Sequence, residues 1–196
     1  MSSDQDQLKE TDTEARFEFK KEQKSAFESE KGLTEETVRV ISDDKDEPEW
    51  MLQRRLRALK QFQQMPMPTD WPGQPDLSEI DIEEIVPYIR PDIDARGGVD
   101  DWTDLPEEIK DTFDKLGIPE AEKNALSGVG AQYESEIVYQ NMQERWEEKG
   151  VIFCDMDKAV QEHEELVKEY FMTKNVPASD NKFAALHGAI WSGGSF

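Results

Sequence analysis

Cysteine and histidine are scarce in this sequence of 196 residues. It contains one cysteine, Cys154, and two histidines, His163 and His187. A single cysteine cannot form an internal disulfide. A structural zinc site needs four ligands and an iron–sulfur cluster typically needs four cysteines, so the segment that holds Cys154 and His163 cannot complete either site alone. We therefore expect no metal site, no cofactor-binding site and no cofactor held by this chain.

Long apolar runs are also missing. No stretch approaches the roughly 18 apolar residues that a transmembrane helix requires. The first residues, MSSDQD, do not resemble the apolar core of a signal peptide. We expect a cytoplasmic protein that does not insert into a membrane.

Basic residues are outnumbered by acidic ones, 23 against 45, which gives a formal net charge of −22. Such a charge repels phosphate backbones and anionic lipid surfaces, so nucleic-acid binding is disfavoured. The acidic residues are spread over several segments, which predicts solvated faces and not paired catalytic acids. This pattern suggests a halophile's cytoplasm, where concentrated salt screens the repulsion. The alternative is an ordinary acidic surface.

Motifs of the common catalytic folds are absent as well. There is no GxxxxGK[ST] phosphate-binding loop and no GxSxG nucleophile motif, and the pairs Gly97-Gly98 and Gly193-Gly194 lack the lysine of a phosphate-binding loop. The residues themselves therefore predict a helical interaction module that is not an enzyme and has no catalytic residues.

What is present divides into four segments. Hydrophobic residues make up only 36% of the chain, so the whole length need not fold. We predict a disordered or weakly helical acidic arm over residues 1–32, a helical segment over 33–65, and a Pro- and Gly-rich irregular linker over 66–104 that could wrap a partner surface. A helical or α+β domain follows over 105–196.

Capping residues and apolar spacing place the expected helices. One starts after Thr34, a second has Pro48 in its first turn and ends at Pro66, and a third runs from the Asp104–Glu107 capping box to Gly117. Shorter helices are expected over 121–126 and 143–149, with 132–142 open to helix or strand.

The C-terminal half adds a small β element. Val151-Ile152-Phe153 favours a short buried strand. A helix capped by Asp155 or Asp157 should follow, with a face formed by Ala159, His163, Leu166 and Tyr170. The last helix is expected to be capped by Ser179 or Asp180 and to present Phe183, Leu186 and Ile190. The predicted fold class is mainly α with a small α+β element.

Three side chains are candidates for chemistry: Cys154, His163 and His187. Cys154 is predicted to be a buried small residue at a strand end, with a nucleophile as the alternative. His163 lies in an apolar stripe and is expected to be half-buried, with a general base as the alternative. His187 either hydrogen-bonds across a helix interface or faces a partner. None is assigned a catalytic or metal-binding role.

Three long stretches resemble one family: DEPEWMLQRRLRAL (46–59), GVIFCDMDKAVQEHEELVKEYF (150–171) and DNKFAALHGAIWSGGSF (180–196). They are similar to the N-terminal region of SufB, the scaffold subunit of the SUF iron–sulfur cluster assembly system. GLTEETVRVIS (32–42) and AQYESEIVY (131–139) fit in the same order. The resemblance therefore covers the chain from about residue 32 to its last residue.

The resemblance implies a helical N-terminal region that leads into a β-helix core, which is absent here. It implies a transient iron–sulfur cluster in the full-length protein, and SufC, SufD and sulfur-transfer proteins as partners, mostly contacted by the missing core. Cys154 does not match a cluster-ligand position of the family. We expect a fragment that acts through protein–protein contacts and stops at the entrance to the core; the alternative is a stand-alone acidic adaptor.

Overall fold

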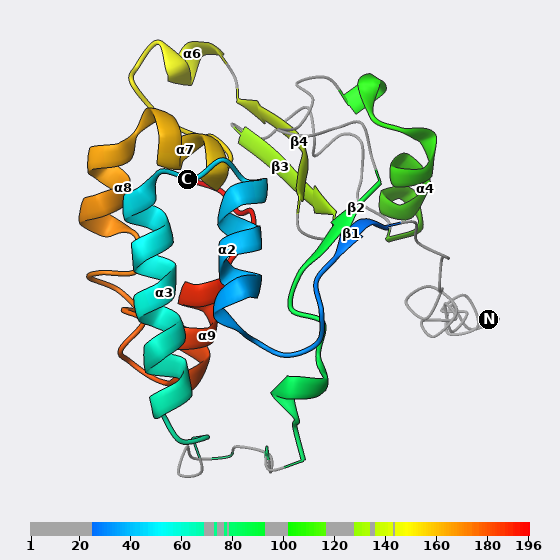
Figure 1. Ribbon diagram of the computed structural model, residues 1–196. Helices are drawn as coiled ribbons and strands as arrows, with labels where there is room; N and C mark the ends of the chain where they lie inside the picture. Colours follow the sequence, from blue (N-terminus) through cyan, green and yellow to red (C-terminus); the bar gives the residue numbers. More distant parts are fainter. Residues whose placement is uncertain are drawn as a thin grey trace, which may run out of the picture.

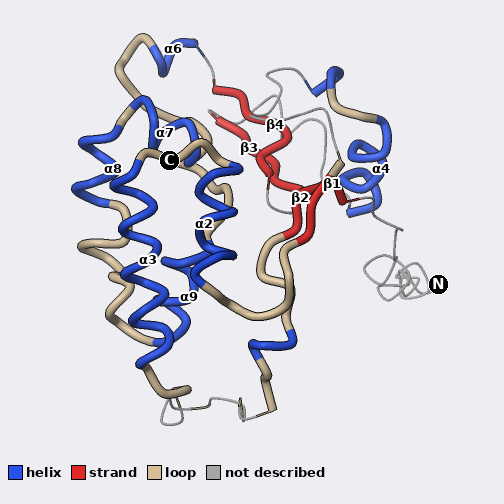
Figure 2. The backbone as a smooth tube through the Cα atoms, in the orientation of Figure 1, coloured by secondary structure: helices blue, strands red, loops and turns tan. Residues whose placement is uncertain are grey.

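The structure is a computed structural model that describes residues 25–68, 73, 77, 79–92, 102–116, 128–133, 136–142 and 144–196. Within these ranges the chain forms seven α-helices and two antiparallel two-stranded sheets (Figures 1 and 2). The predicted class, mainly α with a small α+β element, is confirmed. The helix expected over residues 121–126 and the first 24 residues of the predicted arm lie outside the described ranges.

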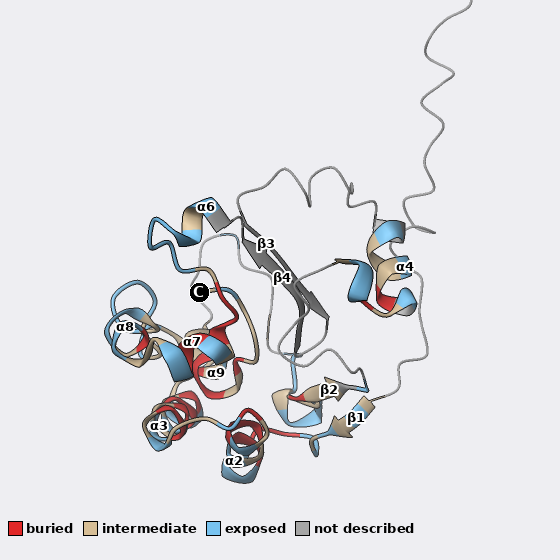
Figure 3. Ribbon diagram, turned by 90° about the horizontal axis from the view of Figure 1, so that it is seen from above, coloured by how far each residue is buried: buried red, intermediate tan, exposed pale blue. Residues whose placement is uncertain are grey.

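The helical core is built from α2 (Glu35–Asp44), α3 (Glu49–Gln64) and α9 (Lys182–Ile190). The buried faces of these helices turn toward one another (Figure 3). As predicted, the Thr34 side chain accepts a hydrogen bond from the Thr37 N–H and caps α2. Pro48 occupies the cap position of α3 and not its first turn.

Small residues form the most deeply buried part of the α9 face, while Leu186 and Ile190 of the predicted face pack against the same core cluster. Ala185, Gly188 and Ala189 are buried, whereas the predicted face of Phe183, Leu186 and Ile190 is only half-buried. The reason is a close approach of two backbones: a Cβ added at Gly188 would lie 2.8 Å from the Ala58 Cβ on α3. Asn181 caps the helix through its side-chain oxygen, so the predicted caps Ser179 and Asp180 are wrong.

The long helix predicted after Cys154 is divided into α7 (Met156–Glu162) and α8 (Glu164–Tyr170). Asp155 caps α7, as one of the two predicted options. His163 departs from helical geometry and separates the two helices. The resulting change of direction alters the buried face: Val160 and Val167 are buried, while Leu166 and Tyr170 of the predicted stripe are exposed.

The predicted strand over residues 151–153 is wrong. Val151 and Ile152 are exposed and unpaired with any described strand. Backbone pairing begins one residue later, because the partner is the C-terminal segment: the Phe196 N–H donates to the Cys154 carbonyl at 2.8 Å, and an isolated bridge joins Asp155 and Ser195. Local sequence could not identify this distant partner.

A sheet joins two segments that were predicted to be irregular. Strand β1 (Ser25–Glu28) pairs antiparallel with β2 (Ile89–Pro91), near the 3-10 helix η2 (Ile82–Glu84). Residues 25–28 therefore depart from the disordered or weakly helical arm that we expected, because their backbone is satisfied by a strand some 60 residues later in the chain. The proposed domain boundaries themselves stay predictions.

The remaining elements are α4 (Glu107–Leu116), the 3-10 helix η3 (Trp102–Asp104), the strands β3 (Gly128–Tyr133) and β4 (Glu136–Met142), and α6 (Glu144–Glu147). Helix α4 confirms the predicted third helix, but it begins at Glu107, and Asp104 of the predicted capping box lies in η3. Residues 132–142, which were left open between helix and strand, form the end of β3 and all of β4 where the structure describes them, and the two strands pair antiparallel. Among the described helices, none combines the length and the apolar character needed to cross a bilayer.

Candidate functional site

Cys154 lies in a closed apolar environment. Its residue is 8% exposed, and it packs in a cluster with Met51, Val160 and Trp191. Its backbone N–H donates to the Phe196 carbonyl at 3.1 Å. Burial raises the pKa of the Cys154 thiol, which keeps it in the protonated, weakly nucleophilic form at neutral pH. The position suits packing and not catalysis.

The two histidines are not arranged around this thiol. The His163 ring stacks on the Phe196 ring, with centroids 6.1 Å apart and planes inclined by 15°. His187 is an exposed residue of α9, and desolvation by the neighbouring protein atoms together with the charge of Arg55 lowers its pKa. Within the described part of the chain, no hydrogen bond joins either imidazole to the sulfur of Cys154. The structure therefore supplies no nucleophile–base pair from the three weighed side chains.

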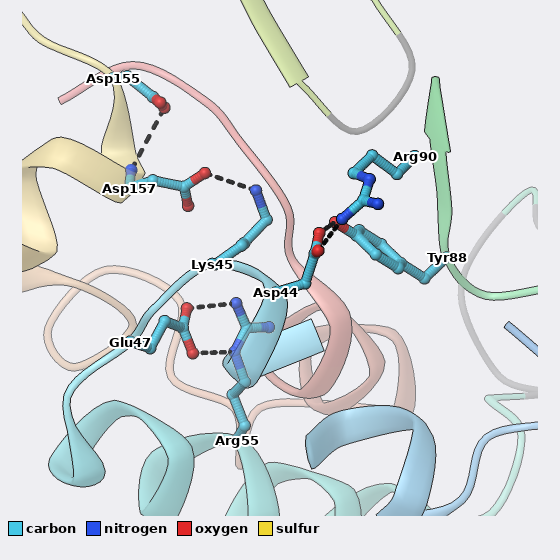
Figure 4. Close-up of polar contacts among 8 residues, drawn as sticks. All are labelled: Asp44, Lys45, Glu47, Arg55, Tyr88, Arg90, Asp155 and Asp157. Carbon is cyan, nitrogen blue, oxygen red and sulfur yellow. Dashed lines mark hydrogen bonds and ion pairs between the residues drawn. The ribbon is translucent and has the colours of Figure 1, made fainter. Parts of the chain in front are cut away.

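A buried ion pair lies at the centre of the helical core. Arg55 on α3 donates from Nε and Nη2 to the two carboxylate oxygens of Glu47, at 2.7 and 2.6 Å (Figure 4). Both side chains are essentially inaccessible, 0% and 1% exposed. Arg55 also donates to the Ala189 carbonyl at 3.2 Å, and its guanidinium lies 4.4 Å from the centroid of the Trp191 ring. Arg55 thus connects α3 to the turn that precedes this helix and to the C-terminal end of α9.

Two further ion pairs join the region between α2 and α3 to other elements. Lys45 contacts Asp157 in the first turn of α7, and Asp44 contacts Arg90 of β2 (Figure 4). The buried Tyr88 donates its hydroxyl to Asp44 Oδ2 at 2.7 Å. We call these residues of the turn, Asp44 to Glu47, the charged hub. The hub joins α2 and α3 to a β-strand and to the C-terminal half.

Asp46 gives the hub its sharp turn. Its φ of 49° lies in the left-handed region, which aspartate tolerates better than most residues. The Glu47 N–H then returns to the Ser42 carbonyl at 3.0 Å, which closes the end of α2. As a result, Asp44 contacts β2, Lys45 contacts α7 and Glu47 contacts α3.

Cations also satisfy the carbonyl ends of two helices. Arg54 donates to the Phe171 and Lys168 carbonyls at 2.8 and 3.1 Å, at the end of α8. Lys182 donates to the Phe62 and Met65 carbonyls at the end of α3, both at 2.8 Å. These positions favour positive charge because the last carbonyls of a helix lack intrahelical partners.

Chemically, this arrangement holds segments together. Asp44 and Glu47 of the hub each face an arginine, and Lys45 faces Asp157. The described residues contain no group of three or more His, Cys, Asp or Glu arranged to hold a metal ion. Sequence reasoning missed the hub. Arg55 carried a usable signal, because it stands four residues from both Met51 and Leu59 on the apolar face of α3.

Comparison with known proteins gives a consistent result. No protein-family model matches the chain. It is 58% identical over 178 residues to a protein of Staphylococcus saprophyticus, 58% over 181 residues to one of Staphylococcus haemolyticus, and 57% over 181 residues to one of Staphylococcus aureus. Each is named an iron–sulfur cluster assembly SufBD family protein. These matches cover 91–92% of this chain.

The chain spans about 37% of the length of these curated relatives. At this level of identity, over nearly the whole chain, the sequence resemblance and the comparisons agree on the same family. Over nearly its whole length, the chain is similar to proteins named as members of the iron–sulfur cluster assembly SufBD family.

Proposed function

We propose that this chain is a SufB-type component of cytoplasmic iron–sulfur cluster assembly, acting through protein–protein contacts without a cluster site of its own. The observation that carries the proposal is the 58% identity over 91% of the chain to a protein named for that process. Its assignment to SufB rests on the three long colinear stretches quoted above.

The cluster-free role is supported by the residues available. The full sequence contains a single cysteine, and that cysteine is buried beside Phe196 with a raised thiol pKa. An iron–sulfur cluster is usually held by four thiolates, with histidine as an occasional substitute. We propose that the transient cluster of the family resides in the part of the relatives that this chain does not span.

We expect the partner proteins, like the cluster, to bind mainly the part of the relatives that this chain does not span. We propose SufC, SufD and the sulfur-transfer proteins as partners of the assembly, with most of their contacts outside the matched region. The described residues would then serve mainly as a folded helical unit, joined internally by the charged hub.

A chimera tests this function. The matched region of the Staphylococcus aureus relative is replaced by this chain, and the hybrid is expressed in strains that lack either SufB or SufD. We expect it to restore growth and aconitase activity in the first strain only, because the matched regions are 57% identical. The same relative with the region deleted serves as the control.

Two outcomes would contradict the proposal. Restoration of the SufD-deficient strain alone would overturn the assignment to SufB. A stable hybrid that behaves like the deletion control in both strains would favour the stand-alone adaptor.

A further inference from the structure

A hollow of about 280 Å³ lies between α3, α9 and the segment that joins α8 to α9. Arg54, Arg57 and Gln61 line it from α3, while Thr173 and Ser179 line it from the segment that joins α8 to α9. Its volume lies just below the range of roughly 300–1,000 Å³ that is typical of small-molecule pockets. It therefore suits a short ligand or one inserted side chain.

The charge of this pocket is opposite to that of the chain. None of its ten lining residues is Asp or Glu, although 45 of the 196 residues of the protein are acidic. Two of the ten are arginines, Arg54 and Arg57, three positions apart on α3. A pocket with two cations and several neutral donors favours an anion.

The two arginines are held differently. Arg54 is half-buried and fixed by its bonds to the Phe171 and Lys168 carbonyls. Burial and the neighbouring charge of Arg57 lower the pKa of Arg54. Arg57 is exposed, and among the described residues it has no hydrogen-bond or ion-pair partner. Its guanidinium remains available to form a paired contact with a carboxylate.

The rest of the lining is apolar and small. Ala58, Met172, Pro177 and Ala178 supply hydrocarbon surface, and Gly188 adds no side chain. This surface suits a short aliphatic stem attached to the anionic group. We propose that the pocket binds an aliphatic carboxylate, carried either by a free small dicarboxylate or by a glutamate side chain of a peptide.

The test uses the full chain labelled with ¹⁵N and titrated with three probes: glutarate, the blocked peptide acetyl-Ala-Glu-Ala-amide, and inorganic phosphate. The reporters are the amide signals of Thr173, Ser179 and Gly188. We expect saturable shifts with at least one carboxylate probe. Arg57→Gln should weaken this binding about tenfold, because it removes a charge-assisted hydrogen bond.

Lys60→Gln is the matched control, since it makes the same charge change at an exposed position on α3 outside the lining. It should change the affinity by less than about twofold. Binding of glutarate alone would identify a free metabolite, and tighter binding of the peptide would identify a protein side chain. The proposal is overturned by absent saturation, by binding of phosphate without either carboxylate, or by equal weakening in both variants.

Discussion

Arg55 buries a full positive charge in the middle of the helical core. Removing a guanidinium from water costs several kcal/mol. Here the cost is offset by two bonds to Glu47, one to the Ala189 carbonyl, and the face of the Trp191 ring. Because Glu47 is equally buried, the two residues depend on each other, and the loss of either leaves an unpaired charge.

Arg55→Met should therefore lower the free energy of unfolding by about 3–5 kcal/mol, because Glu47 would remain buried without its partner. The double variant Glu47→Leu/Arg55→Met should lose clearly less, because it removes both charges. Urea unfolding followed by circular dichroism measures both. A double variant as unstable as Arg55→Met would show that the pair does not act as a unit.

Cys154 provides a second prediction for a single residue. Its thiol is buried and its pKa is raised, so it should react with a thiol reagent such as DTNB far more slowly in the folded chain than in urea. We expect the rates at pH 8 to differ by at least about a hundredfold, because the buried thiol reacts only when the fold around it opens. Equal rates would place the thiol at the surface.

For single residues, the sequence alone predicted which side chains are buried but not which side chains they pair with. The burial of Cys154 and the half-burial of His163 followed from the apolar residues beside them. The pairing of Arg55 with Glu47 did not, because it depends on a left-handed turn at Asp46 that brings residues eight positions apart together.

Among the elements, the contact between α3 and α9 depends on the absence of side-chain atoms. Gly188 lies against Ala58, and a Cβ added there would also lie 3.1 Å from the Ala178 Cβ. In an exposed helix, Gly→Ala is stabilising by roughly 0.5–1 kcal/mol. At this position the crowding should reverse that sign.

Gly188→Ala is thus expected to reduce stability by about 1–3 kcal/mol, the usual cost of overpacking. Thermal unfolding of the single variants and of Gly188→Ala/Ala58→Gly forms a double-mutant cycle. The double variant should be less destabilised than the sum of the two single variants. A stabilising effect of Gly188→Ala would mean that the helices are not packed this closely.

Helix positions were largely predictable and strand pairing was not. Thr34 and Pro48 mark helix starts through local chemistry, which the sequence displays directly. The β1–β2 pair and the bridge from Asp155 to Ser195 join segments far apart in the chain. Such pairings depend on the tertiary fold and have no local signal.

For the whole molecule, the net charge of −22 makes salt a direct influence on stability. Increasing salt from 0.1 M to 1 M shortens the screening length from about 10 Å to about 3 Å, which reduces the repulsion among the acidic faces. We expect the free energy of unfolding to rise by at least about 1 kcal/mol over this range.

Salt also weakens the attraction within the ion pairs of the hub, which opposes this gain in stability. That loss should be small, because these ion pairs are mostly shielded from solvent. Denaturant unfolding at several sodium chloride concentrations measures the balance. A stability that is constant or falls with salt would argue against the halophilic interpretation of the acidic surface.

We propose that this chain serves iron–sulfur cluster assembly without holding a cluster itself. Anaerobic reconstitution of the full chain with ferrous iron and sulfide, followed by desalting and measurement of bound iron and visible absorption, tests it most directly. We predict no charge-transfer absorption and only substoichiometric iron, the same in the chain and in Cys154→Ser. Stoichiometric iron and sulfide with visible absorption, lost in Cys154→Ser, would contradict the account.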